Sequence, residues 1–143
     1  MTEKMTEQMT EQMTEQNKLE YADPLTAPFW EAAARRELVI QRCRHCEHHQ
    51  FYPRPYCLMC QSDNVEWVKA AGRGTIYSMT TVHLEISEEF TPPYVVALVQ
   101  LDEGPRMLAN IVGDQCQIGD RVQVTWKQRP NAPPLPVFQL GSV

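Results

Sequence analysis

The sequence predicts a mainly β protein with a short N-terminal helix, a four-cysteine ribbon and a five-stranded barrel of the OB type. Four cysteines occur as two Cys-x-x-Cys pairs, and the segment after them contains short apolar runs bounded by glycine turns. No helical pattern interrupts those runs, which favours a small closed barrel. The chain has 143 residues, and the roughly 125 that follow the N-terminal repeat suffice for one ordinary domain or two small ones. The predicted parts are a repeat tail (1–20), a helical segment (21–42), a zinc ribbon (43–65) and an OB-fold barrel (66–143).

The N-terminal tail begins with a four-residue repeat, MTEKMTEQMTEQMTEQ. On a helix, its methionines would form a drifting apolar stripe, but its glutamates would stack as like charges. We therefore expect residues 1–20 to be flexible and solvated, with a helix docked on a partner as the alternative.

The segment 21–42 is predicted to be helical and then extended. Proline suits the first turn of a helix, and Pro24 and Pro28 precede a run of good helix formers. Trp30 and Leu38 fall near one face of the helix that follows. Residues 38–42 are predicted to form a strand that leads into the first cysteine pair.

The two cysteine pairs predict a structural zinc site. Cys43 and Cys46 form the first pair, and Cys57 and Cys60 follow after ten intervening residues. Two such pairs are a tetrahedral zinc ligand set, whereas a redox dithiol needs only one. Disulfides in a secreted domain are the alternative; because no signal peptide precedes the pairs, we expect the reducing cytoplasm. A closed four-thiolate site leaves no open position for chemistry.

The barrel segment shows strand patterns separated by turns. Gly72 and Gly74 are expected at a barrel corner, because the helix that a phosphate-binding loop requires does not follow them. Tyr77 and Met79 are expected to share one face of the first strand. The individually predicted strands are 72–83, 93–101, 107–112 and 121–126.

The charge is unevenly distributed along a chain of net charge −5. Residues 35–73 carry seven Lys/Arg against four acids, a net +3, whereas residues 85–120 carry a net −6. A patch of this size suits a few phosphates on a small ligand better than a nucleic-acid backbone. Solvated or partner-facing charges are the alternative. Arginine binds phosphate in a bidentate manner, and the candidates are Arg42, Arg44, Arg54 and Arg73.

No catalytic constellation is predicted. His45, His48 and His49 are expected to face solvent in and after the first cysteine pair, because four cysteines already complete a zinc site. His83 has no neighbouring serine or cysteine in sequence. Cys116 is expected to be a small packing residue rather than a nucleophile. A stand-alone thioesterase or oxidoreductase would lack a nucleophile–base pair.

An ordered set of short motifs runs through residues 24–139: Pro28-Phe29-Trp30, Gln41-Arg42-Cys43, Tyr52-Pro53-Arg54, Gly72-Arg73-Gly74-Thr75-Ile76-Tyr77, Pro93-Tyr94-Val95-Val96, Leu101-Asp102-Glu103-Gly104, Ile118-Gly119-Asp120 and Leu135-Pro136-Val137-Phe138. The set resembles the family of proteins with a rubredoxin-like zinc ribbon and an OB fold, formerly a domain of unknown function linked to acyl-CoA metabolism. Glu47 departs from the family, which usually has glycine there to relieve a positive φ.

The resemblance implies a non-catalytic, zinc-binding accessory subunit of a heteromeric thiolase-type enzyme. Such a subunit supports its partner and contributes to binding coenzyme A or an acyl-CoA, in aromatic, steroid or fatty-acid degradation. Partnership with a hot-dog-fold enoyl-CoA hydratase or a hydroxymethylglutaryl-CoA synthase complex is the alternative.

A nucleic-acid-binding module is a further alternative, because zinc ribbons and OB barrels both occur in such proteins. The acidic barrel segment opposes it. We expect no membrane span, since no run of roughly 18 apolar residues exists.

Overall fold

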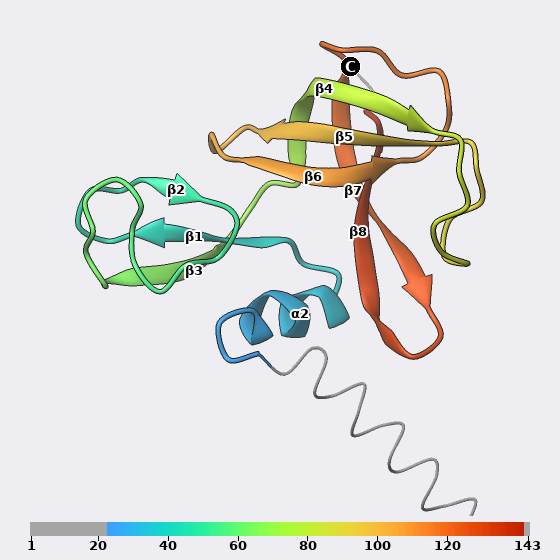
Figure 1. Cartoon of the computed structure of the whole chain (residues 1–143). Helices are drawn as coiled ribbons and strands as arrows, with labels where there is room; N and C mark the ends of the chain where they lie inside the picture. Colours follow the sequence, from blue (N-terminus) through green and yellow to red (C-terminus); the bar gives the residue numbers. More distant parts are fainter. Residues whose placement is uncertain (1–22, 142–143) are drawn as a thin grey trace, which may run out of the picture.

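The computed structural model describes residues 23–141, so the predicted tail lies outside the described residues. A three-stranded sheet lies beside a closed five-stranded barrel, with a helix adjacent to both (Figure 1). The mainly β class and the five-stranded barrel are confirmed. The elements are α2 (Ala27–Ala34), β1 (Val39–Cys43), β2 (His49–Gln50), β3 (Val65–Lys69), β4 (Arg73–Val82), β5 (Tyr94–Leu101), β6 (Arg106–Ile111), β7 (Arg121–Arg129) and β8 (Ala132–Leu140).

Helix α2 has a proline in its first turn, as the sequence predicts, but it ends earlier than Leu38. It stops at Ala34 because Arg36 takes a φ of 59°, which no right-handed helix continues. Phe29 is among its buried residues, and the helix contacts both β8 and β1. Within the described part of the chain, no helix is long and apolar enough to cross a membrane.

Strand β1 is the centre of the ribbon sheet, whose order is β2-β1-β3. Its antiparallel register places Arg42 opposite His49 on one side and opposite Glu66 on the other. The predicted boundary between the zinc ribbon (43–65) and the barrel (66–143) falls between the first two residues of β3. Strand β3 pairs with β1 in the ribbon sheet.

The barrel closes in the order β4-β5-β6-β8-β7, with β7 returning to β4. Neighbours are antiparallel except β6 and β8, which are parallel and meet through the single pair Ile111–Phe138. Five strands closed in this way are consistent with an OB fold. Strand β8 was not among the individually predicted strands, because prolines, which remove ladder donors, crowd it at Pro133, Pro134 and Pro136.

The two glycines predicted at a barrel corner permit a close approach of backbones. Gly72 has a φ of +75°, and its carbonyl accepts a hydrogen bond from the Val124 amide at 2.7 Å. A Cβ at Gly74 would lie 2.4 Å from the carbonyl oxygen of Gln100. Both positions therefore require glycine, and their assignment to a barrel corner stays a prediction.

The prediction that Tyr77 and Met79 share one face of β4 is wrong. The register between β4 and β5 shifts between Ile76 and Ser78, so Tyr77 occupies a bulge that interrupts the alternation. Tyr77 is exposed beneath the Arg106 guanidinium, 3.6 Å from its ring centroid, whereas Met79 packs against the core.

One cluster of buried side chains joins the helix, the ribbon and the barrel. Phe29 of α2 and Ile40 of β1 belong to the same cluster as Val99 and Phe138 of the barrel. Ile40, Val99 and Phe138 are completely inaccessible. The ribbon is therefore packed as part of the domain, and its disorder would expose part of the barrel's core.

Gly74→Ala should destabilise the barrel by about 1–3 kcal/mol, because the new methyl group meets fixed backbone. Its control is Gly141→Ala, where the nearest atom, Arg121 O, would lie 3.7 Å from the Cβ. Urea unfolding followed by tryptophan fluorescence measures both variants. Equal midpoints for both would contradict the closure described for β4 and β5.

Candidate metal centre and its surroundings

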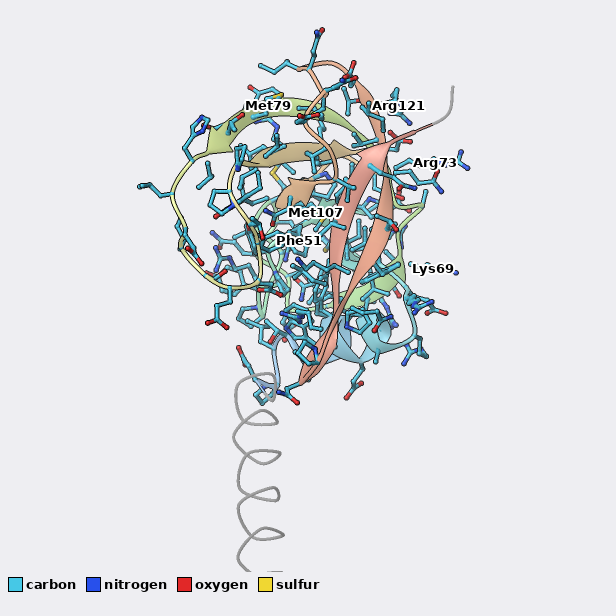
Figure 2. All side chains as sticks on the ribbon, turned by 90° about the vertical axis from the view of Figure 1, so that its right-hand side faces the viewer. Phe51, Lys69, Arg73, Met79, Met107 and Arg121 are labelled. Atoms are coloured by element: carbon cyan, nitrogen blue, oxygen red, sulfur yellow. The ribbon has the colours of Figure 1, made fainter. Side chains whose placement is uncertain are left out.

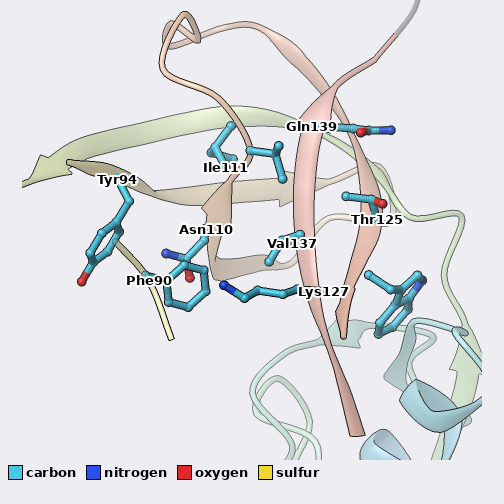
Figure 3. A pocket seen from close by; sticks show the side chains of 10 residues that line it. Phe90, Tyr94, Asn110, Ile111, Thr125, Lys127, Val137 and Gln139 are labelled. Carbon is cyan, nitrogen blue, oxygen red and sulfur yellow. The ribbon is translucent and has the colours of Figure 1, made fainter. Parts of the chain in front are cut away.

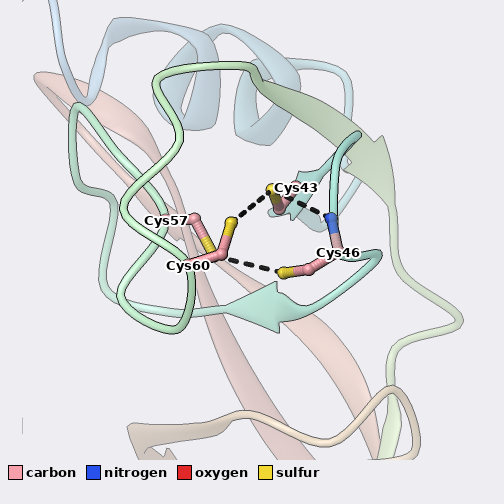
Figure 4. A group of neighbouring side chains, drawn as sticks. All are labelled: Cys43, Cys46, Cys57 and Cys60. Carbon is pink, nitrogen blue, oxygen red and sulfur yellow. Dashed lines mark hydrogen bonds between the residues drawn. The ribbon is translucent and has the colours of Figure 1, made fainter.

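The four predicted zinc ligands converge on one point (Figure 4). Their sulfur atoms all lie within 4.8 Å of one another, and the Cys43–Cys60 and Cys46–Cys57 sulfurs are each 3.6 Å apart. A tetrahedral ion with Zn–S bonds of about 2.3 Å places its sulfurs ~3.8 Å apart. The sulfurs are too far apart for disulfides, which require about 2.05 Å. The donor set therefore fits zinc.

Two nearly identical turns aim the thiols inward. In the first turn, the Glu47 amide donates to the Cys43 carbonyl at 2.9 Å, and in the second the Gln61 amide donates to the Cys57 carbonyl at the same distance. Amides within each turn also point at the first sulfur, from His45 to Cys43 Sγ at 3.3 Å and from Met59 to Cys57 Sγ at 3.4 Å. We call these turns the first and second knuckle.

Glu47, which stands where the family usually has glycine, has the same backbone conformation as the matching residue of the second knuckle. Glu47 has a φ of 66°, and Gln61 at the matching position of the second knuckle has a φ of 63°. Both non-glycine residues thus adopt the left-handed conformation that favours glycine. The Glu47 carboxylate accepts a hydrogen bond from Arg42 Nη2 at 2.9 Å.

The sulfurs need a cation for all four to be ionised together. The backbone amide of Cys46, with that of His45, lowers the pKa of Cys43 to about 6. The amide of Ser62 acts in the same direction on Cys60, but desolvation and the neighbouring sulfurs outweigh it and raise the pKa of Cys60 to about 12. A bound divalent cation would supply the charge that stabilises four thiolates.

A buried pair of amides fastens the second knuckle to the ribbon sheet. Gln41 and Gln50 are each 3% exposed, and Gln50 Nε2 donates to Gln41 Oε1 at 2.8 Å. Gln41 bonds both the amide and the carbonyl of Arg54, at 2.8 and 2.9 Å. Gln50 bonds the Tyr56 carbonyl at 3.1 Å and the Leu58 amide at 3.0 Å. Sequence reasoning missed this network. The pattern that could have indicated it is a glutamine in each of the two strands that flank the first cysteine pair.

Two of the four candidate arginines are joined by one carboxylate. Arg42 Nη1 lies 3.1 Å from Glu66 Oε1, and Arg44 Nε lies 2.9 Å from Glu66 Oε2. Hydrogen bonds from Arg44 and then Arg42 lower the pKa of Glu66. This stabilisation is present at neutral pH and is lost as the pH falls through the lowered pKa. The β1–β3 register brings these charges together.

The other two arginines lie apart from that group. Arg54 is exposed in the segment that enters the second knuckle, and Arg73 is exposed at the start of β4 on the barrel. Figure 2 shows Arg73 and Arg121 on the same side of the barrel. Arg121 binds Asp102 through two hydrogen bonds of 2.7 and 2.9 Å. Within residues 23–141, neither Arg54 nor Arg73 makes a side-chain hydrogen bond or ion pair.

The remaining candidates show no catalytic pairing. Among residues 23–141, no hydrogen bond joins a histidine side chain to a serine, threonine or cysteine. His45, His48 and His83 are exposed, and His49 is half-buried in β2. Cys116 is 7% exposed within the core cluster, and desolvation raises its pKa.

A cavity of about 400 Å³ opens on the barrel beside the single β6–β8 pair (Figure 3). Phe90 and Tyr94 form one wall, with ring centroids 5.5 Å apart. Lys127 lies 4.0 Å from the centroid of Phe90 and also donates to the Glu89 carbonyl. Sequence reasoning missed this cavity because its lining comes from separate strands and the loop before β5.

The fold and the site define a zinc ribbon followed by an OB barrel. Two family models match in that order: the rubredoxin-like zinc ribbon domain of ChsH2 over residues 30–66, and its C-terminal OB-fold domain over residues 67–127. The solved structure titled "Ltp2-ChsH2(DUF35) aldolase" superposes with a TM-score of 0.75 and 40% identity, over 82% of this chain and 95% of that one. The chain belongs to the ChsH2-type DUF35 family.

The curated relatives include subunits that are named after enzymes. A probable enoyl-CoA hydratase alpha subunit of Thermomonospora curvata is 44% identical over 115 residues, covering 78% of this chain. This chain spans only about a third, 36%, of that protein. The benzoylsuccinyl-CoA thiolase subunit BbsA of Geobacter metallireducens is 29% identical over 86 residues, which are 59% of this chain and 58% of BbsA.

Cys43→Ser and Cys57→Ser should each abolish stoichiometric zinc, because each removes one thiolate from a closed set. Cys116→Ser is the control and should keep one zinc per chain, since that thiol lies outside the cluster. Metal analysis after gel filtration measures the ratio. Retention of one zinc by both ligand variants would show that the ligand assignment is wrong.

Proposed function

We propose that this chain is a non-catalytic, zinc-binding accessory subunit of a heteromeric enzyme that acts on an acyl-CoA. The observation that carries the proposal is the closed four-sulfur site in a member of a family in which some named relatives are subunits of acyl-CoA enzymes and others are scaffold proteins. A site that uses all four tetrahedral positions has none left for a substrate. The chemistry would then belong to a partner.

The first candidate partner is a thiolase-type catalytic subunit, supported by the likeness to BbsA. An enoyl-CoA hydratase subunit is the second candidate, and the 44% identity to a hydratase alpha subunit favours it specifically. In both cases this chain would supply a rigid ribbon and barrel against which the catalytic subunit assembles.

The contribution to coenzyme A binding is best assigned to Arg73 among the four candidate arginines. Arg42 and Arg44 are engaged by Glu66, so a phosphate would have to displace a carboxylate that both already bind. Arg73, like Arg54, is exposed and makes no ion pair within the described chain, so its guanidinium can donate two hydrogen bonds to a phosphate. Hydrogen bonds from Arg121 lower the pKa of Asp102, and the charge of Arg73 also helps to lower it.

Affinity purification of the tagged chain from its native host should recover an acyl-CoA enzyme subunit in a fixed ratio. The isolated chain should turn over no acyl-CoA, whereas the complex should. Mass spectrometry of the recovered subunit separates thiolase, hydratase and hydroxymethylglutaryl-CoA synthase partners. Recovery of only RNA or DNA at ordinary salt would refute the accessory-subunit proposal and favour the nucleic-acid alternative.

Arg73→Ala should weaken coenzyme A binding by the purified complex at least roughly tenfold, because one charge-assisted contact contributes about 1.5–3 kcal/mol, or about 10- to 150-fold in the dissociation constant. Arg44→Ala is the comparison and should change the affinity less, since Glu66 already binds that guanidinium. Isothermal calorimetry with coenzyme A measures both variants. An unchanged dissociation constant for Arg73→Ala would remove this residue from the ligand site.

A further inference from the structure

The second knuckle exposes an unusual concentration of large apolar side chains. Of the eleven exposed large hydrophobic residues in the described part, four lie between residues 52 and 59. Met59 is 69% exposed and Leu58 is 53% exposed. We define the second-knuckle surface as Tyr52, Arg54, Tyr56, Leu58 and Met59.

The first knuckle has the same backbone but a polar outside. Arg44 and His45 occupy the positions that correspond to Leu58 and Met59, between the two cysteines of each pair. In both turns the thiols point inward (Figure 4), and the two residues between the cysteines are exposed. The zinc site therefore explains why Leu58 and Met59 are exposed, but it does not require them to be apolar.

The composition of the second-knuckle surface matches the centre of protein–protein interfaces. Tyrosine, methionine and arginine are enriched there, whereas lysine, glutamate and aspartate are depleted. Residues 51–60 contain no lysine, glutamate or aspartate.

The surface is also held in one conformation. Gln41 and Gln50 bond the backbone of Arg54, Tyr56 and Leu58 from the inside, and both glutamines are 3% exposed. A loop that is already ordered loses little conformational entropy on binding.

The exposed charge of Arg54 indicates which chemical groups a partner would need. Arg54 is exposed in the same short segment as the apolar side chains and forms no ion pair within residues 23–141. A partner that covered Leu58 and Met59 would desolvate this cation as well, and it would need a carboxylate opposite to it. The complementary face is therefore apolar with an acidic group.

We propose that the second-knuckle surface is the docking surface for the catalytic subunit of the acyl-CoA enzyme, which presents an apolar recess with a carboxylate facing Arg54. This inference rests on the proposed function and adds the location of the contact. The first knuckle, with Arg44 tied to Glu66, stays outside it.

The test compares Leu58→Gln/Met59→Gln with His45→Gln/His48→Gln, each as a tagged full chain purified from the native host. Glutamine removes apolar surface without adding charge beside the thiolates. The variant of the second knuckle should recover at least tenfold less acyl-CoA enzyme subunit per chain, whereas the variant of the first knuckle should recover the wild-type amount within twofold. Zinc content should stay at one per chain in both, which separates lost docking from lost folding.

Arg54→Ala provides an independent variant and should reduce recovery several-fold, because the partner's carboxylate loses its counter-ion.

Unchanged recovery by Leu58→Gln/Met59→Gln at full zinc content would overturn the docking surface and leave the proposed function standing. Absence of any acyl-CoA enzyme subunit from the wild-type preparation would overturn the proposed function and the partner named here. A wild-type dimer of the isolated chain that Leu58→Gln/Met59→Gln converts to a monomer, seen by sedimentation, would assign the surface to a second copy instead.

Discussion

Convergence of four cysteine sulfurs on one point is the constraint on which the ribbon depends. Strand β2 has only two residues and the two knuckles are short turns, so besides the metal site their positions depend on a few backbone hydrogen bonds and, for the second knuckle, on the Gln41–Gln50 pair. Zinc bound by such a set contributes on the order of 10–16 kcal/mol in small zinc-finger peptides. Because Leu38 and Ile40 share a core cluster with barrel residues, the same constraint also orders one wall of the barrel's core.

A closed metal site and a shared core give this protein the character of a rigid support. The buried Gln41–Gln50 pair extends that rigidity outward to the segment that carries Tyr56 and Leu58. The charges on the other side of the ribbon neutralise one another through Glu66. The first knuckle is thus polar, and the charges beside it are paired within the chain. The second knuckle is apolar, and its cation, Arg54, has no ion pair within residues 23–141.

Sequence reasoning predicted the features that depend on local chemistry. Cysteine spacing predicted the four residues that converge, and the glycine pattern marked Gly72 and Gly74, two positions that require glycine. Reasoning from local pattern failed where tertiary contacts decide. Strand β8 pairs despite three prolines, and the bulge at Tyr77 reverses the expected faces of β4. Only the ion pairs in the folded structure show that Arg42 and Arg44 bind the same carboxylate, that of Glu66.

The claim that the metal supports the structure and leaves the chemistry to the partner is tested most directly by metal replacement. Cadmium is a soft divalent ion that a four-thiolate site accepts. The complex should be purified with cadmium in place of zinc, and its steady-state rate with the acyl-CoA should be measured across pH. A structural site predicts a kcat within about twofold of the zinc form and an unchanged pH profile. A tenfold change in kcat, or a shifted profile with the complex intact, would place the metal in the reaction and contradict the account.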